Sequence, residues 1–172
     1  MKLEGADLAR FEQYVEADRR RLFRLAFGLY GEIALAEDLV QETLVRIAQV
    51  WHRIDARGPH SYANTTLVRL YLRQHRRWKP PVSAVIEYQH QTVDATTHVD
   101  DRMRIVAALA QLPPRQRLTV ALRYLCDQSE VQTAAVMGCS VGTVKRQTST
   151  ALEKLNESLA ETSSERSERS QL

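Results

Sequence analysis

Three polar residues at helical spacing, Asp38, Gln41 and Glu42, form the most informative pattern in this chain. At 3.6 residues per turn they share one helix face with Gln49. The opposite face is apolar and carries Ala36, Leu39, Val40, Thr43, Leu44, Ile47, Val50 and Trp51. Carboxylate and amide groups can pair with arginine and backbone groups of a partner helix. Taken alone, such a polar face is most often a solvated helix surface, and its groups could also contact a partner protein.

A second pattern is a run of basic residues without acids. Residues 56–86 contain six basic residues and no acid, whereas residues 1–55 carry ten acids against eight lysines and arginines. One side of a helix over residues 61–79 would present Tyr62, Thr65, Arg69, Arg73 and Arg76, called the basic stripe below. Arginine binds phosphate through two N–H groups, and an aromatic ring can stack on an unpaired base. The basic stripe predicts contact with nucleic acid; the alternative is a solubilising face, which normally mixes both signs.

A third pattern predicts a helix-turn-helix. A short helix is expected from Gln128 or Ser129 to Met137. Gly138, the next residue, suits the left-handed conformation that ends a helix. Ser140 is a good N-cap for the following helix. In this motif the first residues of the second helix enter the major groove of DNA. The residues in that position are Ser140, Val141, Gly142, Thr143, Lys145, Arg146 and Ser149. A helical hairpin without DNA contact is the alternative.

Catalysis, metal binding and a cofactor are not predicted. Cys126 and Cys139 are too few for a disulfide framework and are interpreted as small packing residues. No serine or cysteine is paired with a recognisable base. The histidines lack the spacing of metal ligands; they are His52, His60, His75, His90 and His98.

These sites require helices to position them, and the sequence predicts an all-α fold of two small helical domains joined by a flexible linker. Six glycines, five prolines and 44% hydrophobic residues suit a helical protein. Helices are expected over residues 6–14, 19–30, 33–51, 61–79 and 84–89, from 101 to 112, from 113 onward, and through the helix-turn-helix. The predicted division is a first domain at 1–80, a linker at 81–100, a second domain at 101–160 and a disordered tail at 161–172.

The chain is expected to stay in the cytoplasm without membrane insertion. No apolar run approaches the roughly 18 residues that span a bilayer. The N-terminal segment "MKLEGADLARFEQ" has no apolar core of the kind that secretion signals carry.

Four segments carry a resemblance to a known family. They are "AEDLVQETLVRI", "SYANTTLVRLYLRQHRRW", "LPPRQRLTVALRYL" and "GCSVGTVK". In order and spacing they resemble the extracytoplasmic-function sigma factors, small sigma-70 family members with two conserved domains, and most of all the actinobacterial SigE-type group. The resemblance covers about residues 8–157. It implies a bacterial transcription initiation factor that is not an enzyme.

The resemblance also implies partners and roles. Core RNA polymerase would bind Asp38, Gln41 and Glu42 through the clamp helices of its largest subunit. Promoter DNA would be bound at the −35 element by the helix-turn-helix residues named above. The loop from Asp55 to Ser61 would capture a flipped base of the −10 element. The other −10 contacts would be Tyr62, Thr65, Arg69, Arg73, Arg76 and Arg77. An anti-sigma factor is a further partner that the family admits.

The recognition helix departs from the family pattern. After the segment "SVGTVK" the family continues with Ser-Arg, a leucine and another Arg, whereas this chain has Arg146, Gln147, Thr148, Ser149 and Thr150. Gln147 and Thr150 thus replace basic groups that would meet phosphate, and Thr148 replaces a buried leucine. We therefore expect weak −35 binding and a C-terminal domain of marginal stability.

Two competing interpretations remain at this point. One is a one-component helix-turn-helix regulator, which would need a small-molecule pocket in residues 1–80 and does not account for the basic stripe. The other is a polymerase-binding protein with poor promoter recognition, which the altered recognition helix would favour.

Overall fold

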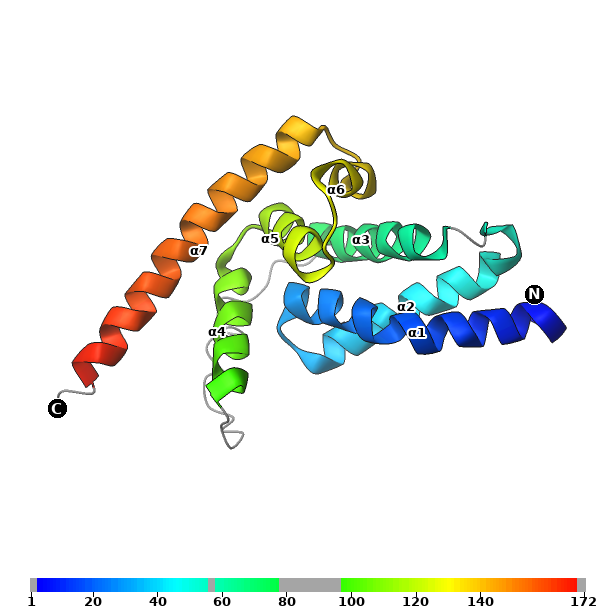
Figure 1. The fold of residues 1–172 in the computed structure, drawn as a ribbon, viewed down its shortest axis with the longest axis horizontal. Coiled ribbons are helices and arrows are strands. Elements are labelled where there is room, and N and C mark those ends of the chain that lie inside the picture. The colour runs from blue at the N-terminus through cyan, green and yellow to red at the C-terminus, as the bar shows by residue number, and fades with distance from the viewer. Residues whose placement is uncertain (1–2, 56–57, 78–96, 170–172) are drawn as a thin grey trace.

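The computed structural model describes the backbone of residues 3–55, 58–77 and 97–169 (Figure 1). Within these ranges the side chains of residues 76–77, 97–103 and 160–169 are not described. All regular structure in the described part is helical, which confirms the predicted all-α fold. Most of the predicted linker, with the short helix expected at 84–89, lies outside the described residues.

The N-terminal half is a bundle of three helices: α1 (Gly5–Tyr30), α2 (Ile33–Val50) and α3 (Pro59–Arg77). The prediction of two separate helices in residues 6–30 was wrong, because α1 is continuous. No glycine or proline interrupts residues 6–27, and Asp18 at the expected break bonds to Tyr14 and Arg21 one turn on either side. Gly31, at φ 72°, ends α1 in the left-handed conformation that glycine adopts easily.

The helices of this half pack by the faces that the sequence predicts. Leu39, Val40 and Ile47 of α2 are buried, as are Leu67 and Tyr71 of α3. Trp51 begins a short 3-10 helix, η1 (Trp51–Arg53), and is also buried. The predicted core residue Trp78 lies outside the described residues. Truncating a fully buried leucine of this kind costs about 2–5 kcal/mol.

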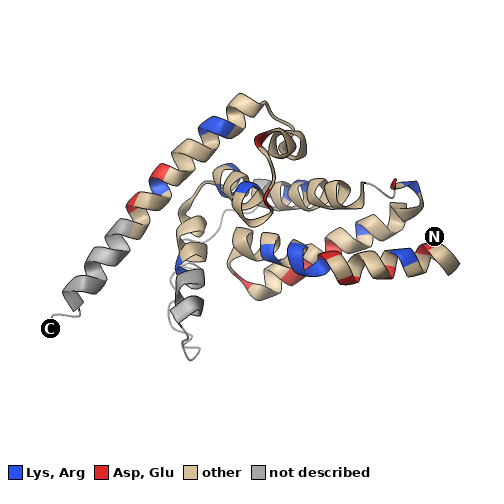
Figure 2. Cartoon of the chain, viewed as in Figure 1, with Lys and Arg blue, Asp and Glu red and all other residues tan. Residues whose placement is uncertain are grey.

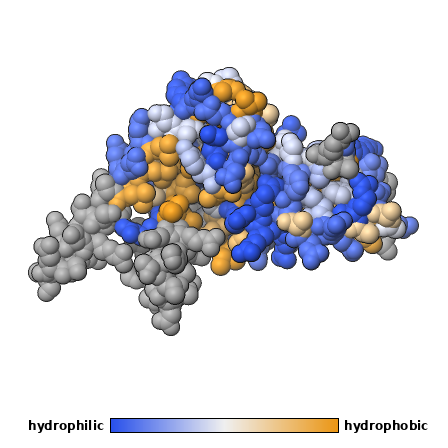
Figure 3. All heavy atoms as spheres, viewed as in Figure 1, coloured by the Kyte–Doolittle hydropathy of each residue, from blue (hydrophilic) through white to orange (hydrophobic). Residues whose placement is uncertain are grey.

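The C-terminal half contains α4 (Thr97–Gln111), α5 (Pro114–Val120), α6 (Glu130–Met137) and α7 (Val141–Arg169). A π-helical turn, η4 (Ala121–Leu125), extends α5. Pro114 begins α5, as predicted, since proline suits the first turn of a helix. Hydrophobic residues gather where α4, α5 and α7 meet (Figure 3), and the small core there contains Leu109, Leu112, Val120, Ala151 and Leu155.

The structure differs from two predicted boundaries of this half. α4 starts at Thr97, inside the predicted linker, and α7 continues to Arg169 through most of the predicted disordered tail. The tail is polar, but it contains no glycine or proline after Gly142 that would end a helix. A helix already nucleated by Ser140 and packed by its first turns can propagate through such a sequence, because elongation needs no new nucleus.

The two halves pack directly against each other. α1 contacts α4 and η4, and α3 contacts α5 and α6. Figure 1 shows α5 and α6 lying over α3, with α4 and α7 projecting away from the N-terminal bundle.

Candidate nucleic-acid interface

The basic stripe lies along the exposed side of α3. Tyr62 is 43% exposed, and Arg69 and Arg73 are exposed. Thr65 is half-buried, and its hydroxyl donates to the carbonyl of Ser61 at 3.0 Å. The opposite side of the helix is buried in the bundle, so the predicted separation of the two faces is confirmed for these residues. Arg76 and Arg77 belong to the last turn of α3, and their side chains lie outside the described part.

The charge pattern of α3 sets it apart from its neighbour. Between its first and last residues α3 has no acid, whereas α1 carries both acids and bases (Figure 2). A helix whose exposed face carries only positive charges attracts polyanions, because no carboxylate on that helix compensates its cations.

Glu42 connects the basic stripe to the polar face of α2. Its carboxylate accepts from Arg46 at 2.7 Å and from Arg73 of α3 at 3.2 Å. Asp38 and Gln41 are exposed on the same face of α2. The structure therefore places the three predicted docking residues together, but the Glu42 carboxylate already carries two partners. Asp38 and Gln41 are the members of the set that project outward.

A buried ionic network lies behind the start of α3. Asp18 is 2% exposed; its carboxylate accepts from Tyr14 at 2.8 Å and from Arg21 at 2.6 and 2.8 Å. His60, in the first turn of α3, lies 3.1 Å from the same carboxylate, and Arg21 also donates to Asn64 of α3 at 2.7 Å. The network therefore ties α1 to the residues that follow the Asp55–Ser61 loop.

Burial alone would raise the pKa of Asp18. The hydrogen bonds from Arg21 and Tyr14 outweigh it and hold the pKa of that carboxyl below its ordinary value. The sequence patterns described above did not reveal this network. The available signal was a charged residue on the apolar stripe of α1, since Asp18 falls in line with Tyr14 and Leu22 at helical spacing.

A hollow of about 300 Å³ opens beside the Asp55–Ser61 loop. Aromatic and polar side chains from α1, η1 and the loop line it: Arg10, Gln13, Tyr14, Ala17, Trp51, Ile54, Asp55, Pro59 and His60. Tyr14 lies against both Trp51 and His60, with ring centroids 5.2 and 5.6 Å apart. The wall of the hollow is therefore partly aromatic, and the rings of Tyr14 and Trp51 in it are only 7% and 6% exposed.

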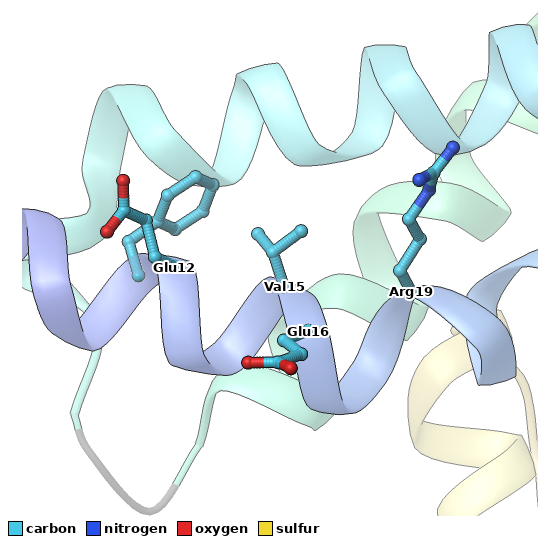
Figure 4. A pocket seen from close by; sticks show the side chains of 5 residues that line it. Glu12, Val15, Glu16 and Arg19 are labelled. Atoms are coloured by element: carbon cyan, nitrogen blue, oxygen red, sulfur yellow. The ribbon is translucent and has the colours of Figure 1, made fainter.

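A second hollow, of about 470 Å³, lies on α1 and contains none of the predicted site residues (Figure 4). It is lined by Phe11, Glu12, Val15, Glu16 and Arg19. Glu12 and Glu16 rim its half-buried apolar floor. Two acids at its rim make this hollow unsuited to the phosphate backbone.

The helix-turn-helix has the predicted geometry. Ser129 caps α6 in a reciprocal capping box with Gln132, and Gly138 adopts the left-handed conformation at φ 63°. Ser140 Oγ accepts from the backbone N–H of Thr143 at 3.1 Å and thereby caps α7. Val144 is fully buried.

The remaining residues predicted to read the −35 element line the outer side of the first turns of α7. Gly142, Lys145, Arg146 and Ser149 are exposed, while Val141 and Thr143 are half-buried. Two of these side chains have acidic neighbours. Lys145 Nζ lies 3.7 Å from Glu130, and the hydroxyl of Ser149 donates to Glu153 at 3.1 Å.

The altered residues of the second helix of the motif do not all point outward. Gln147 is half-buried, and its side-chain oxygen accepts from the Thr119 hydroxyl of α5 at 2.8 Å. This side chain therefore holds α7 against α5, and the loss of a phosphate contact at this position stays a prediction. Thr148 does lie on the buried side, as predicted, and its hydroxyl has no hydrogen-bond partner in the described part of the chain.

We predict that Thr148→Val raises the free energy of unfolding by about 1 kcal/mol, because it removes a buried hydroxyl that makes no hydrogen bond. Thr133 is fully buried in α6 and its hydroxyl is likewise unpaired among the described residues, so Thr133→Val should act in the same direction. Urea denaturation of the full chain measures both.

Thr119→Val is the matched control for these two substitutions. Its hydroxyl has two acceptors for its one proton, the Gln147 side-chain oxygen and the carbonyl of Arg115, each at 2.8 Å, so the same change should lower stability by about 1 kcal/mol. Equal effects at all three threonines would show that the hydrogen bonding of the hydroxyl does not decide whether the substitution raises or lowers the free energy of unfolding.

The described residues contain no group of three or more histidine, cysteine or acidic side chains able to hold a metal ion. Cys126 and Cys139 are free, half-buried and packed against the main core, which confirms their interpretation as packing residues. Among the helices searched, none is both long and apolar enough to cross a membrane.

Comparison with known proteins decides the family. Sigma-70 region 2 matches residues 14–79, and Sigma-70, region 4 matches residues 102–155. The RNA polymerase sigma-E factor of Streptomyces coelicolor is 32% identical over 157 residues, which cover 89% of this chain and 88% of that protein. The chain belongs to the extracytoplasmic-function group of the sigma-70 family. The predicted family is thereby confirmed.

Other relatives and solved structures agree. The ECF RNA polymerase sigma factor SigL of Mycobacterium tuberculosis is 32% identical over 147 residues, or 81% of this sigma factor and 83% of SigL. The fold is similar to that of the sigma factor RpoE of Bartonella quintana, solved with the anti-sigma factor NepR. The TM-score is 0.68 at 24% identity, over 87% of this chain and 96% of that one. CnrH, solved with the cytosolic domain of CnrY, has a TM-score of 0.63 at 21% identity, over 87% of each chain.

Proposed function

We propose that this sigma factor binds core RNA polymerase, directs it to promoters with −35 and −10 elements and helps to melt them, without catalysing a reaction itself. The observation that carries the proposal is the pairing, on one chain of this family, of an exposed one-signed helix with an exposed helix-turn-helix. The basic helix suits the −10 element, and the helix-turn-helix suits the −35 element.

The −10 element is assigned to α3 and to the hollow at its start. Arg69 and Arg73 supply cations for the phosphate backbone, and Tyr62 supplies an exposed ring. The hollow of about 300 Å³ beside the Asp55–Ser61 loop has room and aromatic walls for a base that has left the duplex. Unstacking a base costs a few kcal/mol, which strand binding along the basic stripe would offset.

The −35 element is assigned to the first turns of α7, where Lys145 and Arg146 are exposed. The proximity of Glu130 to Lys145 lowers the net attraction of this surface for phosphate. We therefore expect weak −35 binding, because Glu130 offsets the charge of Lys145.

Core polymerase is assigned to the exposed face of α2. Asp38, Gln41 and Gln49 supply polar groups, and Val45 lies between them with 56% of its surface exposed. An apolar side chain surrounded by polar ones suits the centre of a protein interface, where water is excluded. An anti-sigma partner stays a prediction.

Run-off transcription with core polymerase and a genomic promoter library tests the proposal. We expect transcripts that depend on the added chain and start downstream of shared −35 and −10 sequences. Polymerase binding without specific initiation would instead favour a polymerase-binding protein with poor promoter recognition. DNA binding without polymerase binding would favour a one-component regulator.

We predict that Asp38→Ala with Gln41→Ala weakens core-polymerase binding by roughly tenfold or more, since truncation of two interface side chains commonly costs above about 1 kcal/mol. Both side chains are exposed, so helicity and stability should be unchanged. Fluorescence titration measures the affinity. Glu12→Ala with Gln13→Ala removes the same side-chain types from the exposed face of α1 and should leave the affinity unchanged.

A further inference from the structure

An arginine of α2 lies beside the basic stripe of α3. α2 and α3 run side by side (Figure 1), and Oε1 of Glu42 accepts from an arginine of each. Arg46 Nη2, one turn further along α2, donates to this oxygen at 2.7 Å, and Arg73 Nη2 of α3 donates to it at 3.2 Å. Because both contacts share one oxygen atom, the two guanidinium groups lie next to each other across the boundary between the helices.

An ordinary ion pair within one helix accounts for only part of this cluster. Glutamate four residues before arginine is a common stabilising pair on helix surfaces, and Glu42 with Arg46 fits that pattern. Arg73 is not part of it, since it lies 31 positions away in the sequence. The exposed side of α3 has no acid of its own, so the carboxylate that contacts Arg73 comes from α2.

Arg46 has hydrogen-bonding capacity that Glu42 does not use. Its Nε is buried and makes no hydrogen bond in the described part of the chain. A guanidinium carries five N–H donors, and a buried donor without an acceptor is unfavourable. A second anionic oxygen, or a small rotation of the side chain towards an external anion, would satisfy this group.

The chemistry of the cluster is that of a phosphate site with a carboxylate in it. A carboxylate and a phosphodiester each carry one negative charge over two oxygens, and arginine binds both through paired N–H groups. The side chains of Arg73 and Glu42 are 56% and 35% exposed, so an external anion can reach them. Ion pairs this exposed are weak and change an equilibrium constant by no more than about fivefold.

We propose that Arg46 and Arg73 form a binding site for one backbone phosphate of the −10 strand, and that the Glu42 carboxylate is the internal anion which this phosphate replaces. A strand held by Arg69, one turn before Arg73, presents its neighbouring phosphates at high effective concentration, so a weak internal pair can be displaced. The basic stripe then continues from α3 onto α2. This inference rests on the proposed function, which assigns the −10 strand to α3.

Arg46→Gln tests the site directly. Holoenzyme assembled with saturating core polymerase is titrated with a pre-melted −10 fragment, by fluorescence anisotropy across a salt series. We expect the affinity to fall by about fivefold near 0.1 M salt, and the slope of log affinity against log salt to become less negative by about 0.7–0.9. Arg20→Gln removes one arginine from the exposed surface of α1 and should leave the slope unchanged.

Arg46→Lys distinguishes phosphate binding from a structural role of this side chain. Lysine keeps the charge and loses the paired N–H groups, so the salt slope should stay at the wild-type value while the affinity falls. A residue that only supports the packing of α2 would change the fraction of folded protein, measured by circular dichroism, and would leave the salt slope unchanged in both variants.

Glu42→Gln tests the internal anion. It removes the competing charge at nearly constant size, so the affinity for the same fragment should rise by about two- to fivefold. Saturating core polymerase keeps any change in polymerase binding out of this measurement. Arg46→Gln should cost more affinity in the Glu42→Gln background than in the wild type, because the two residues are coupled. Glu16→Gln removes one acid from the exposed surface of α1 and measures the effect of net charge alone.

The outcome for Arg69→Ala separates this inference from the proposed function. If Arg69→Ala makes the salt slope less negative and Arg46→Gln does not, the phosphate site is overturned and the proposed function stands. If the wild-type holoenzyme does not bind the fragment, or Arg69→Ala changes nothing, both are overturned. An affinity that stays the same or falls in Glu42→Gln would overturn the assignment of Glu42 as the internal anion.

Discussion

Asp18→Asn is expected to lower the free energy of unfolding by about 3–5 kcal/mol, because removing one partner of a buried ion pair leaves the other charge uncompensated. Arg21 would lose its counter-charge while its side chain stays 22% exposed, and the single amide oxygen of asparagine could not accept from both Tyr14 and His60. Since these interactions hold the start of α3, the loop that precedes the basic stripe should loosen as well. Urea denaturation followed by circular dichroism measures the change.

Asp7→Asn is the matched control, because Asp7 also pairs with an arginine three residues later in α1. That pair, with Arg10 at 3.5 Å, is exposed, so its loss should change stability by less than about 1 kcal/mol. Equal losses for the two substitutions would contradict a stabilising role for burial of the Asp18 network.

The same network sets a pH dependence. The pKa of Asp18 lies below its unfolded value, so its contribution to stability is present above about pH 4 and is lost as the pH falls through the folded pKa. At the other end of the scale, burial among aromatic and polar groups raises the pKa of Tyr71 to about 12. The stability that depends on neutral Tyr71 is therefore present up to about pH 10 and is lost as the pH rises towards 12. Asp18→Asn should flatten the acid limb of the stability curve.

Arg69→Ala with Arg73→Ala is expected to weaken binding of the holoenzyme to a pre-melted −10 element by roughly tenfold for each arginine–phosphate pair removed, near 0.1 M salt. The slope of log affinity against log salt should become less negative by about 0.7–0.9 per pair, because fewer counterions are released. The effect at Arg73 includes its pair with Glu42, so the two single variants separate the contributions. Fluorescence anisotropy across a salt series measures affinity and slope together.

Arg20→Ala with Arg24→Ala removes the same charge at the same helical spacing from the exposed surface of α1. If the basic stripe contacts DNA, this control should leave both the affinity and the salt slope close to those of the wild-type holoenzyme. An equal change in slope for the two double variants would mean that net charge, and not the position of α3, determines binding.

Helical faces and caps were predictable because they depend on residues only a few positions apart. The α2 face with Leu39 and Ile47 inside and Asp38 outside follows from the helical period alone. The helix-turn-helix follows from local chemistry in the same way, with Gly138 for the left-handed turn and Ser140 for the cap.

Interactions between distant segments could not be predicted from local pattern. Glu42 has the pattern of an exposed docking residue, and its pair with Arg73 requires α2 and α3 to lie side by side. Gln147 occupies the position of a cation in the family, and its bond to Thr119 requires α7 to cross α5. Asp18 is visible as a charge on an apolar stripe, but its partner His60 is 42 positions away in the sequence.

The sequence by itself determined the all-α class, the sigma family, the two polar helix faces and the two helix caps of the helix-turn-helix. Each depends on spacing within one helix or on the order of short motifs, which a linear chain specifies directly. Only the tertiary structure decided that Arg117 caps α1 and that Leu118 and Met137 belong to the core of the other half. Burial and cross-helix hydrogen bonds depend on which surfaces meet in space, and an apolar side chain is equally compatible with any complementary surface until the packing is known.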